Sequence, residues 1–131
     1  MDLKKAFATD KKLELEGVWH DLGEGAGVLI ARIGNRRYQN ALNKTLADNR
    51  TMIKTGLMSE EAAEKDLCEI IADTILLDWK NIDDDGQPLP YTKENAVAML
   101  IKYPDFRVLV VDLAGISDNY RPATDKEALG K

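Results

Sequence analysis

The chain has 131 residues, with 23 Asp and Glu against 18 Lys and Arg for a net charge of −5. This length buries the core of one domain, and the acidic balance argues against a general nucleic-acid-binding protein, which needs a basic surface. The one cysteine, Cys68, rules out an internal disulfide, and no apolar run approaches the roughly 20 residues of a membrane-spanning helix, so we expect a soluble intracellular protein.

The N-terminal part of the sequence predicts a lead-in and one β-hairpin. Residues 1–11 are charged and lack regular apolar spacing, so we expect them to be flexible. Alternating residues from Leu13 to Trp19 predict a first strand, and the β-branched stretch 28–33 predicts a second after a glycine-rich turn. Residues 12–33 are therefore predicted to form a β-hairpin that no third strand joins.

From Arg36 onward the apolar spacing becomes helical, and residues 36–116 are predicted to hold about four helices. Gly56 is placed to end the first helix in a left-handed cap, and Ser59 is placed to cap the start of the second. Because the link between them is short, we expect these two helices to form an antiparallel hairpin. The second helix is predicted to continue through the apolar run that ends at Trp79.

The C-terminal half is predicted to hold two further helices and a tail. Thr92 is placed to cap one helix through its hydroxyl group, and Pro104 suits the first turn of the next. The β-branched stretch 108–111 leaves a strand open as the alternative to that last helix. Residues 118–131 are expected to be a polar tail after a single domain at residues 12–117. The predicted fold class is α+β, mainly α, with an N-terminal β-hairpin followed by about four helices.

The acidic segment 81–86 resembles the first half of an EF-hand loop, in which oxygen ligands alternate before a glycine. Calcium needs about seven oxygens and takes two of them from a glutamate at the last loop position. Counted from Asn81, that position is held by Thr92, and Glu94 comes two residues too late. We therefore expect a solvated acidic turn that binds no metal, and no cofactor elsewhere in the chain.

The sequence offers few candidates for catalysis. His20 is the only histidine and Cys68 the only thiol, and no motif of a nucleophile with its base flanks either residue, so we read both as structural. We expect that the protein is not an enzyme. A basic cluster near the end of the predicted hairpin reads as a solvated face rather than an anion site; it consists of Arg32, Arg36, Arg37 and Lys44.

Large apolar residues lie on both sides of the proline-containing segment 88–90. As part of the core they need no further explanation, whereas exposed aromatic residues anchor partner segments at many interfaces. Both interpretations stay open. The partner-binding hypothesis concerns four residues, Trp79, Leu89, Tyr91 and Phe106.

The order of these features resembles the tail assembly chaperones of long-tailed bacteriophages. The similarity begins with EGVWHDLGEGAGVLIARIGNRRYQNAL, in which a glycine-tryptophan strand is followed by a strand ending in Arg-x-Gly-Asn and by a helix. It continues with ILLDW at residues 75–79, the polar loop DDDGQPLPYTKENA and the Pro104-Asp105-Phe106 start of the last helix. The similar region spans about residues 13–120.

The resemblance implies a non-enzymatic role in the host cytoplasm. Such proteins bind the long, apolar tape-measure protein before the tail tube polymerises around it, and they keep it soluble. They also help to recruit tail tube subunits, often through an extended form made by ribosomal frameshifting. The resemblance supplies no catalytic residues, and it leaves a homo-oligomer open. The alternative is a minor structural tail or connector protein of the virion.

Overall fold

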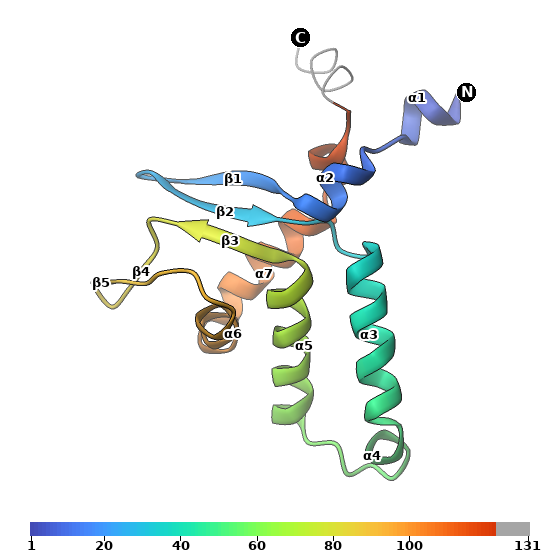
Figure 1. The fold of residues 1–131 in the computed structure, drawn as a ribbon, viewed down its shortest axis with the longest axis vertical. Coiled ribbons are helices and arrows are strands. Elements are labelled where there is room, and N and C mark those ends of the chain that lie inside the picture. The colour runs from blue at the N-terminus through green and yellow to red at the C-terminus, as the bar shows by residue number, and fades with distance from the viewer. Residues whose placement is uncertain (123–131) are drawn as a thin grey trace.

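The computed structural model describes residues 1–122 as a small sheet packed on a group of helices (Figure 1). α3 and α5 run side by side away from the sheet, with α4 at their far end. No helix in this described part is both long and apolar enough to cross a membrane. In chain order the elements are α1 (Leu3–Phe7), α2 (Lys11–Glu16), β1 (Val18–Gly23), β2 (Ala26–Ile30), α3 (Arg36–Asp48), α4 (Arg50–Lys54), α5 (Glu60–Thr74), β3 (Leu76–Lys80), β4 (Asp83–Asp84), β5 (Gln87–Pro88), α6 (Lys93–Lys102), α7 (Pro104–Gly115) and the 3₁₀ helix η1 (Ser117–Tyr120).

Three antiparallel strands form the main sheet in the order β1, β2, β3. β2 is central, so that Val28 pairs with His20 of β1 on one side and with Trp79 of β3 on the other. One face of the sheet supplies Val28 and Ile30 to the core. Trp19 on β1 is 44% exposed, so the sheet also presents apolar surface to solvent. β4 and β5 form a separate two-stranded hairpin.

The predicted fold class, α+β and mainly α, is confirmed. The expectation that no third strand joins the hairpin is wrong, because the end of the predicted second helix is β3. α5 stops at Thr74, whose carbonyl oxygen accepts a hydrogen bond from the Asn35 side chain at 3.1 Å. A bulge then shifts the register of β3, so that Leu76 and Trp79 are both buried. The bulge removes the alternation by which a strand is recognised in a sequence.

The first hairpin is shorter than the predicted residues 12–33, because its N-terminal part is the helix α2. The Asp10 side chain caps this helix by accepting hydrogen bonds from two backbone N–H groups at 2.9 and 3.3 Å. Gly17 ends it with a φ of 87°. The alternation of Leu13 and Leu15 predicts a strand, but the cap at Asp10 favours a helix over these residues.

The later helices begin where their predicted caps lie. The hydroxyl groups of Ser59 and Thr92 each accept a hydrogen bond from the backbone N–H three residues on, at 3.1 and 2.9 Å. Pro104 is the first residue of α7, and the stretch 108–111 lies within this helix rather than in a strand. The first predicted helix is divided at Asn49 into α3 and α4.

Asn35 connects α3 to α5. Its side-chain oxygen accepts a hydrogen bond from the N–H of Tyr38 at 3.0 Å and so caps α3. Its amide group donates to the carbonyl oxygens of Arg32 at 2.7 Å and Thr74 at 3.1 Å. One buried side chain thus satisfies backbone groups at the start of one helix and at the end of the other, which fixes the two helices relative to each other.

The core lies between the helix-facing side of the sheet and α5, α6 and α7. Figure 1 shows these helices on the same side of the strands. The buried residues that pack together there are Val28, Ile30, Cys68, Ile71, Ala72, Ile75, Leu76, Trp79, Ala96, Leu100, Val110 and Ala114.

The two ends of the described chain lie close together in space (Figure 1). The predicted flexible lead-in contains α1, and the N–H of Asp10 donates to the carbonyl oxygen of Tyr120 at 2.7 Å. Tyr120 belongs to the predicted polar tail at residues 118–131, yet it is fully buried and its hydroxyl donates to the carbonyl oxygen of Ile30 at 3.1 Å. The tail prediction is therefore wrong for η1. A single buried aromatic residue produces no repeating apolar pattern, so the sequence gives no sign of this helix. Residues 123–131 lie outside the described part.

A partly buried ion pair joins α2 to the segment after β2. The Glu14 carboxylate is 2.7 Å from the guanidinium of Arg32 and 2.5 Å from the hydroxyl of Thr9, and both donate hydrogen bonds to it. Burial acts to raise the pKa of Glu14, but the hydrogen bonds from Thr9 and Arg32 and the charge of Lys11 together lower it below 4.5. Arg32 of the predicted basic cluster is therefore part of a structural network.

We expect Glu14 to contribute stability that is lost in acid. Because its folded pKa lies below the unfolded value of 4.5, the stabilisation is complete above that pH and disappears as pH falls through the folded pKa. Urea unfolding of the wild type and of Glu14→Gln should therefore differ more at about pH 7 than at about pH 3. The exposed Glu24→Gln is the matched control, and a Glu14→Gln difference independent of pH would contradict the prediction.

Candidate partner-binding site

The four residues predicted to bind a partner form one cluster beside β3. The Trp79 ring meets the Tyr91 ring edge to face, with centroids 5.1 Å apart at 86°, and the Phe106 ring at 6.5 Å and 66°. The indole N–H of Trp79 donates to the carbonyl oxygen of Leu89 at 2.8 Å. Trp79 is only 5% exposed, while the other three are partly buried. Trp79 therefore lies in the core, and its ring holds the proline-containing segment against the sheet.

Tyr91 fastens the end of this segment to the helix and strand below it. Its hydroxyl donates to the carbonyl oxygen of Leu76 at 2.6 Å, and the carbonyl oxygen of Ala72 lies 3.3 Å from the same hydroxyl. Burial raises the pKa of Tyr91 to about 12, and the nearby charges of Asp78 and Asp73 act in the same direction. The phenol thus stays protonated and keeps its hydrogen bond to Leu76 at neutral pH.

The predicted acidic turn is the tip of the β4–β5 hairpin. Asp85 and Gly86 have φ values of 51° and 76°, the left-handed conformation of the two-residue turns that join antiparallel strands. Asp84 accepts hydrogen bonds from the Tyr103 hydroxyl at 2.5 Å and from the Lys102 ammonium at 2.9 Å, and these hydrogen bonds lower the pKa of Asp84. Within residues 1–122 no group of three or more His, Cys, Asp or Glu side chains is placed to hold a metal ion.

Cys68 is fully buried in α5, as a small apolar residue of the core. Its sulfur accepts a hydrogen bond from the guanidinium of Arg107 at 3.2 Å. Arg107 also donates to the Glu64 carboxylate at 3.3 Å and to the carbonyl oxygen of Leu100 at 3.4 Å. The thiol thus contributes to the packing of α5 against α7.

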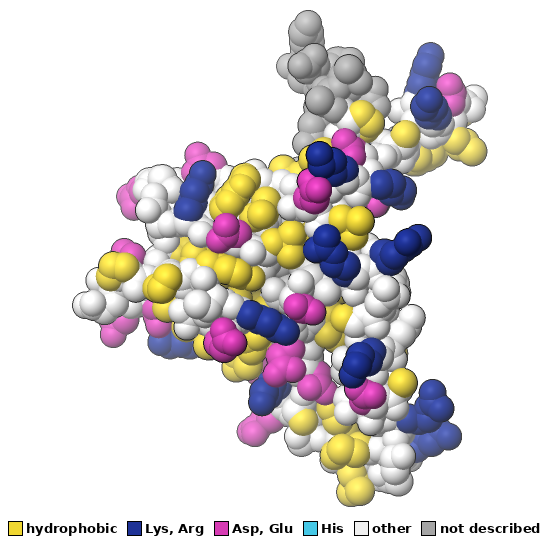
Figure 2. Space-filling model, viewed as in Figure 1, with side chains coloured by type: hydrophobic (Ala, Val, Ile, Leu, Met, Phe, Trp, Pro, Cys, Tyr) yellow, Lys and Arg dark blue, Asp and Glu magenta, His cyan; other side chains and the backbone are white. Residues whose placement is uncertain are grey.

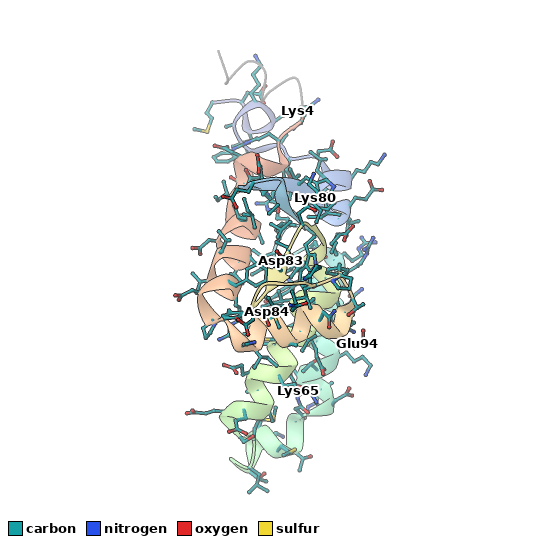
Figure 3. The ribbon with its side chains drawn as sticks, turned by 90° about the vertical axis from the view of Figure 1, so that its left-hand side faces the viewer. Lys4, Lys65, Lys80, Asp83, Asp84 and Glu94 are labelled. Atoms are coloured by element: carbon teal, nitrogen blue, oxygen red, sulfur yellow. The ribbon has the colours of Figure 1, made fainter. Side chains whose placement is uncertain are left out.

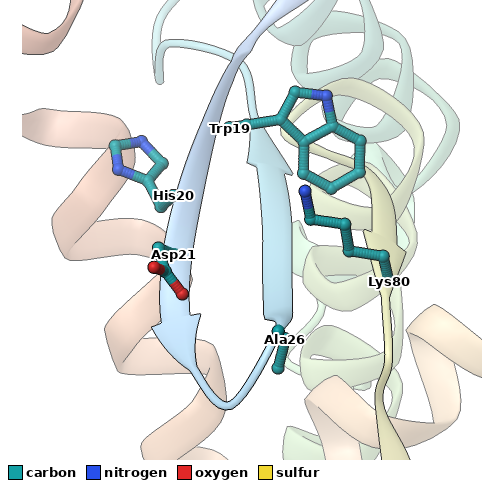
Figure 4. Close-up of a pocket in the computed structure, with 6 residues that line it drawn as sticks. Trp19, His20, Asp21, Ala26 and Lys80 are labelled. Carbon is teal, nitrogen blue, oxygen red and sulfur yellow. The ribbon is translucent and has the colours of Figure 1, made fainter.

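His20 lies on β1 beside a hollow of about 250 Å³ (Figure 4). Trp19 and His20 project to opposite sides of the strand, while Lys80 approaches the Trp19 ring with its ammonium 4.9 Å from the ring centre. Lys80 and the Trp19 ring therefore lie on one side of β1, and His20 lies on the other side.

Two apolar pockets lie along α5 and share Leu67 as a lining residue, and we call the two together the helical groove. Its part nearer the sheet is lined from α3, α5 and α7, and its part nearer α4 is lined from α3, α4 and α5. Leu67 on α5 lines both parts and is 41% exposed. The apolar residues that line it are Ile33, Tyr38, Leu42, Leu46, Ile53, Met58, Ala63, Leu67, Ile70, Ile71, Val108 and Val111.

Three further side chains of this groove are about half exposed, namely Leu46 at 50%, Ile53 at 49% and Val108 at 55%. The sequence pattern assigns the apolar residues of α3 and α5 to buried faces, and the two helices do pack on each other. The apolar stripes of α3 and α5 are wider than the surface over which the two helices touch. No element of residues 1–122 covers the edges of these stripes. In Figure 2, apolar side chains accordingly gather near the far end of the α3–α5 pair as well as over the strands.

Residues 33–131 match the model of a family described as the YdaY prophage protein. This region includes β3 and every helix that lines the helical groove, whereas the strands β1 and β2 precede it. No curated protein and no solved structure matches the chain.

Proposed function

The chain belongs to the YdaY prophage protein family, and on that premise we propose that it is a phage tail assembly chaperone. In this role it binds the tape-measure protein and keeps it soluble until the tail tube forms around it. The proposal rests on the prophage family, on the resemblance of the sequence to tail assembly chaperones, and on one structural observation. That observation is the helical groove.

The helical groove has the form of a site for an amphipathic helix. Such helices bind by placing apolar residues at positions i, i+3, i+4 and i+7 into a groove between helices. Leu67 lines both parts of the groove, whereas Leu46 and Ile53 line the part nearer α4 and Val108 lines the part nearer the sheet. In this proposal the tape-measure protein is long, helical and apolar. An apolar stripe along one of its helices would therefore pack against the residues that line the helical groove.

Polar groups at the edges of the groove supply orientation. Asp66 lines the part nearer α4 and accepts a hydrogen bond from the Asn49 side chain at 2.8 Å. Arg107 and Asp112 line the part nearer the sheet. Charged side chains at the rim of an apolar interface favour one register and direction of the bound helix.

The proposed role needs binding and release but no chemical step. We therefore propose that the protein is not an enzyme, acts in the host cytoplasm without a cofactor, and leaves nucleic acids and membranes unbound. Recruitment of tail tube subunits through a frameshifted extension belongs to the same proposal.

Replacing Leu67 with glutamine is expected to weaken binding of a tape-measure segment by about 2 kcal/mol or more, as at the centre of other interfaces. Glutamine keeps the helix propensity of leucine, so α5 should remain folded. Calorimetric titration of a purified tape-measure segment into the wild type and the variant measures the difference.

The matched control for this titration is Leu57→Gln. Leu57 is 72% exposed and does not line the helical groove, so its replacement should leave the affinity unchanged. Equal affinities for the wild type and Leu67→Gln would remove the groove from the proposed function.

A further inference from the structure

A second apolar hollow lies between the two hairpins and the α6–α7 pair, and we call it the acidic hollow. Its volume is about 370 Å³, within the range of about 300–1,000 Å³ found for ligand pockets. Three consecutive aspartates, residues 83–85, stand at its edge. The apolar and aromatic residues that line it are Leu22, Trp79, Ile82, Met99, Tyr103 and Phe106.

The negative charge at the edge of the acidic hollow is not fully neutralised. Asp84 pairs with Lys102 at 2.9 Å. Asp83 and Asp85 form no ion pair with any residue of the described chain 1–122. The hollow therefore combines apolar walls with two free carboxylates, which suits a segment that is both apolar and basic.

Helix α1 has the complementary character. Leu3 and Phe7 are 66% and 63% exposed, and their spacing of four residues places them on one face of the helix. Lys4 and Lys5 lie between them in sequence and form no ion pair within the part of the chain that is described. A helix of five residues gains little stability by itself, and within residues 1–122 this apolar face remains largely uncovered.

We propose that α1 of one copy of this chain docks in the acidic hollow of a second copy. Leu3 and Phe7 fill the apolar hollow, while Lys4 and Lys5 face Asp83 and Asp85. This inference is independent of the proposed function, because it involves neither the helical groove nor a tape-measure protein.

A copy does not fill its own hollow. α1 and the β4–β5 hairpin lie on opposite sides of the molecule in Figure 1, and Figure 3 places Lys4 at one end, well away from Asp83 and Asp84. The Arg121 guanidinium fixes α1 in this position by donating to the carbonyl oxygen of Ala6 at 2.7 Å. Since the two contacting surfaces are different, the contact is heterologous and joins copies head to tail into a ring or an open filament.

Analytical ultracentrifugation of the full chain up to millimolar concentration tests the proposal. The wild type should self-associate, and Phe7→Ser should weaken the association at least tenfold. Asp83→Lys and the double change Lys4→Glu with Lys5→Glu should each weaken it several-fold at low salt, and less at high salt because surface charges are then screened. A chain that carries all three charge changes should recover part of the lost association.

Two control variants change similar residues elsewhere, Leu57→Ser and Glu61→Lys, and both should associate as the wild type does. A wild type that stays monomeric overturns the proposal, as does an association that Phe7→Ser and Asp83→Lys leave unchanged. If the chain with all three charge changes recovers no association, the proposed pairing of α1 with the acidic hollow is wrong. Binding of the monomer to anionic lipid vesicles, lost in Phe7→Ser, would assign α1 to membranes and also overturn the proposal.

Discussion

Replacing Trp79 with alanine is expected to lower the free energy of unfolding by about 3–5 kcal/mol, the usual effect of removing a buried aromatic side chain. Trp79 is 5% exposed, contacts the rings of Tyr91 and Phe106, and donates a hydrogen bond to Leu89. A loss of this size is a large part of the total stability of a small domain, about 5–15 kcal/mol. Urea unfolding followed by circular dichroism measures it.

The other tryptophan provides the matched control. Trp19 is 44% exposed on the solvent-facing side of β1, so Trp19→Ala should lower the free energy of unfolding by no more than about 1 kcal/mol. If Trp79→Ala were as stable as Trp19→Ala but failed to bind the tape-measure protein, Trp79 would be a partner anchor rather than a core residue.

Replacing Tyr120 with alanine is expected to have a similar effect, a loss of about 3–5 kcal/mol. Its side chain is fully buried, its hydroxyl bonds to the backbone of Ile30 in β2, and its carbonyl oxygen accepts a hydrogen bond from Asp10. The residue therefore ties η1 to the central strand and to the start of α2. Unfolding in urea is again the measurement.

Tyr120→Phe separates the packing of the ring from its hydrogen bond. It keeps the ring and should lower the free energy of unfolding by only about 1 kcal/mol, the typical net contribution of one hydrogen bond. A stable Tyr120→Ala variant would mean that η1 does not hold the two ends of the described chain together.

The parts of the fold that the sequence predicts well have a local physical cause. Ser59, Thr92 and Pro104 each place the start of a helix through a cap or a fixed φ, and the structure places the helices there. Gly56 has a φ of 70°, as its predicted cap requires. These signals involve neighbouring residues only, so no tertiary information is needed to read them.

The parts that the sequence does not predict depend on contacts between distant segments. β3 is a strand because it pairs with β2, and its bulge hides the alternation of its apolar residues. Tyr120 is buried by β2, which lies 90 residues earlier.

The β4–β5 hairpin, in contrast, does have a local signal in the sequence, since Asp85-Gly86 is a typical two-residue turn sequence.

The candidate site likewise has one part that the local sequence predicts and one part that depends on contacts between distant segments. Sequence reasoning found the cluster of Trp79, Leu89, Tyr91 and Phe106 because large apolar residues flank a distinctive proline-containing segment. It missed the helical groove, because Leu46, Leu67 and Val108 each continue the apolar stripe of their own helix. Which edge of a stripe remains uncovered depends on how α3, α5 and α7 pack together, and that arrangement depends on long-range contacts such as the hydrogen bond from Asn35 to the carbonyl oxygen of Thr74.

Co-expression with a candidate tape-measure protein from a prophage is the most direct test of the central claim. The account predicts that the tape-measure protein is soluble only when this chain is present, and that the two proteins elute together in size-exclusion chromatography. A tape-measure protein that is equally soluble with and without the chain, with no complex surviving chromatography, would contradict the account.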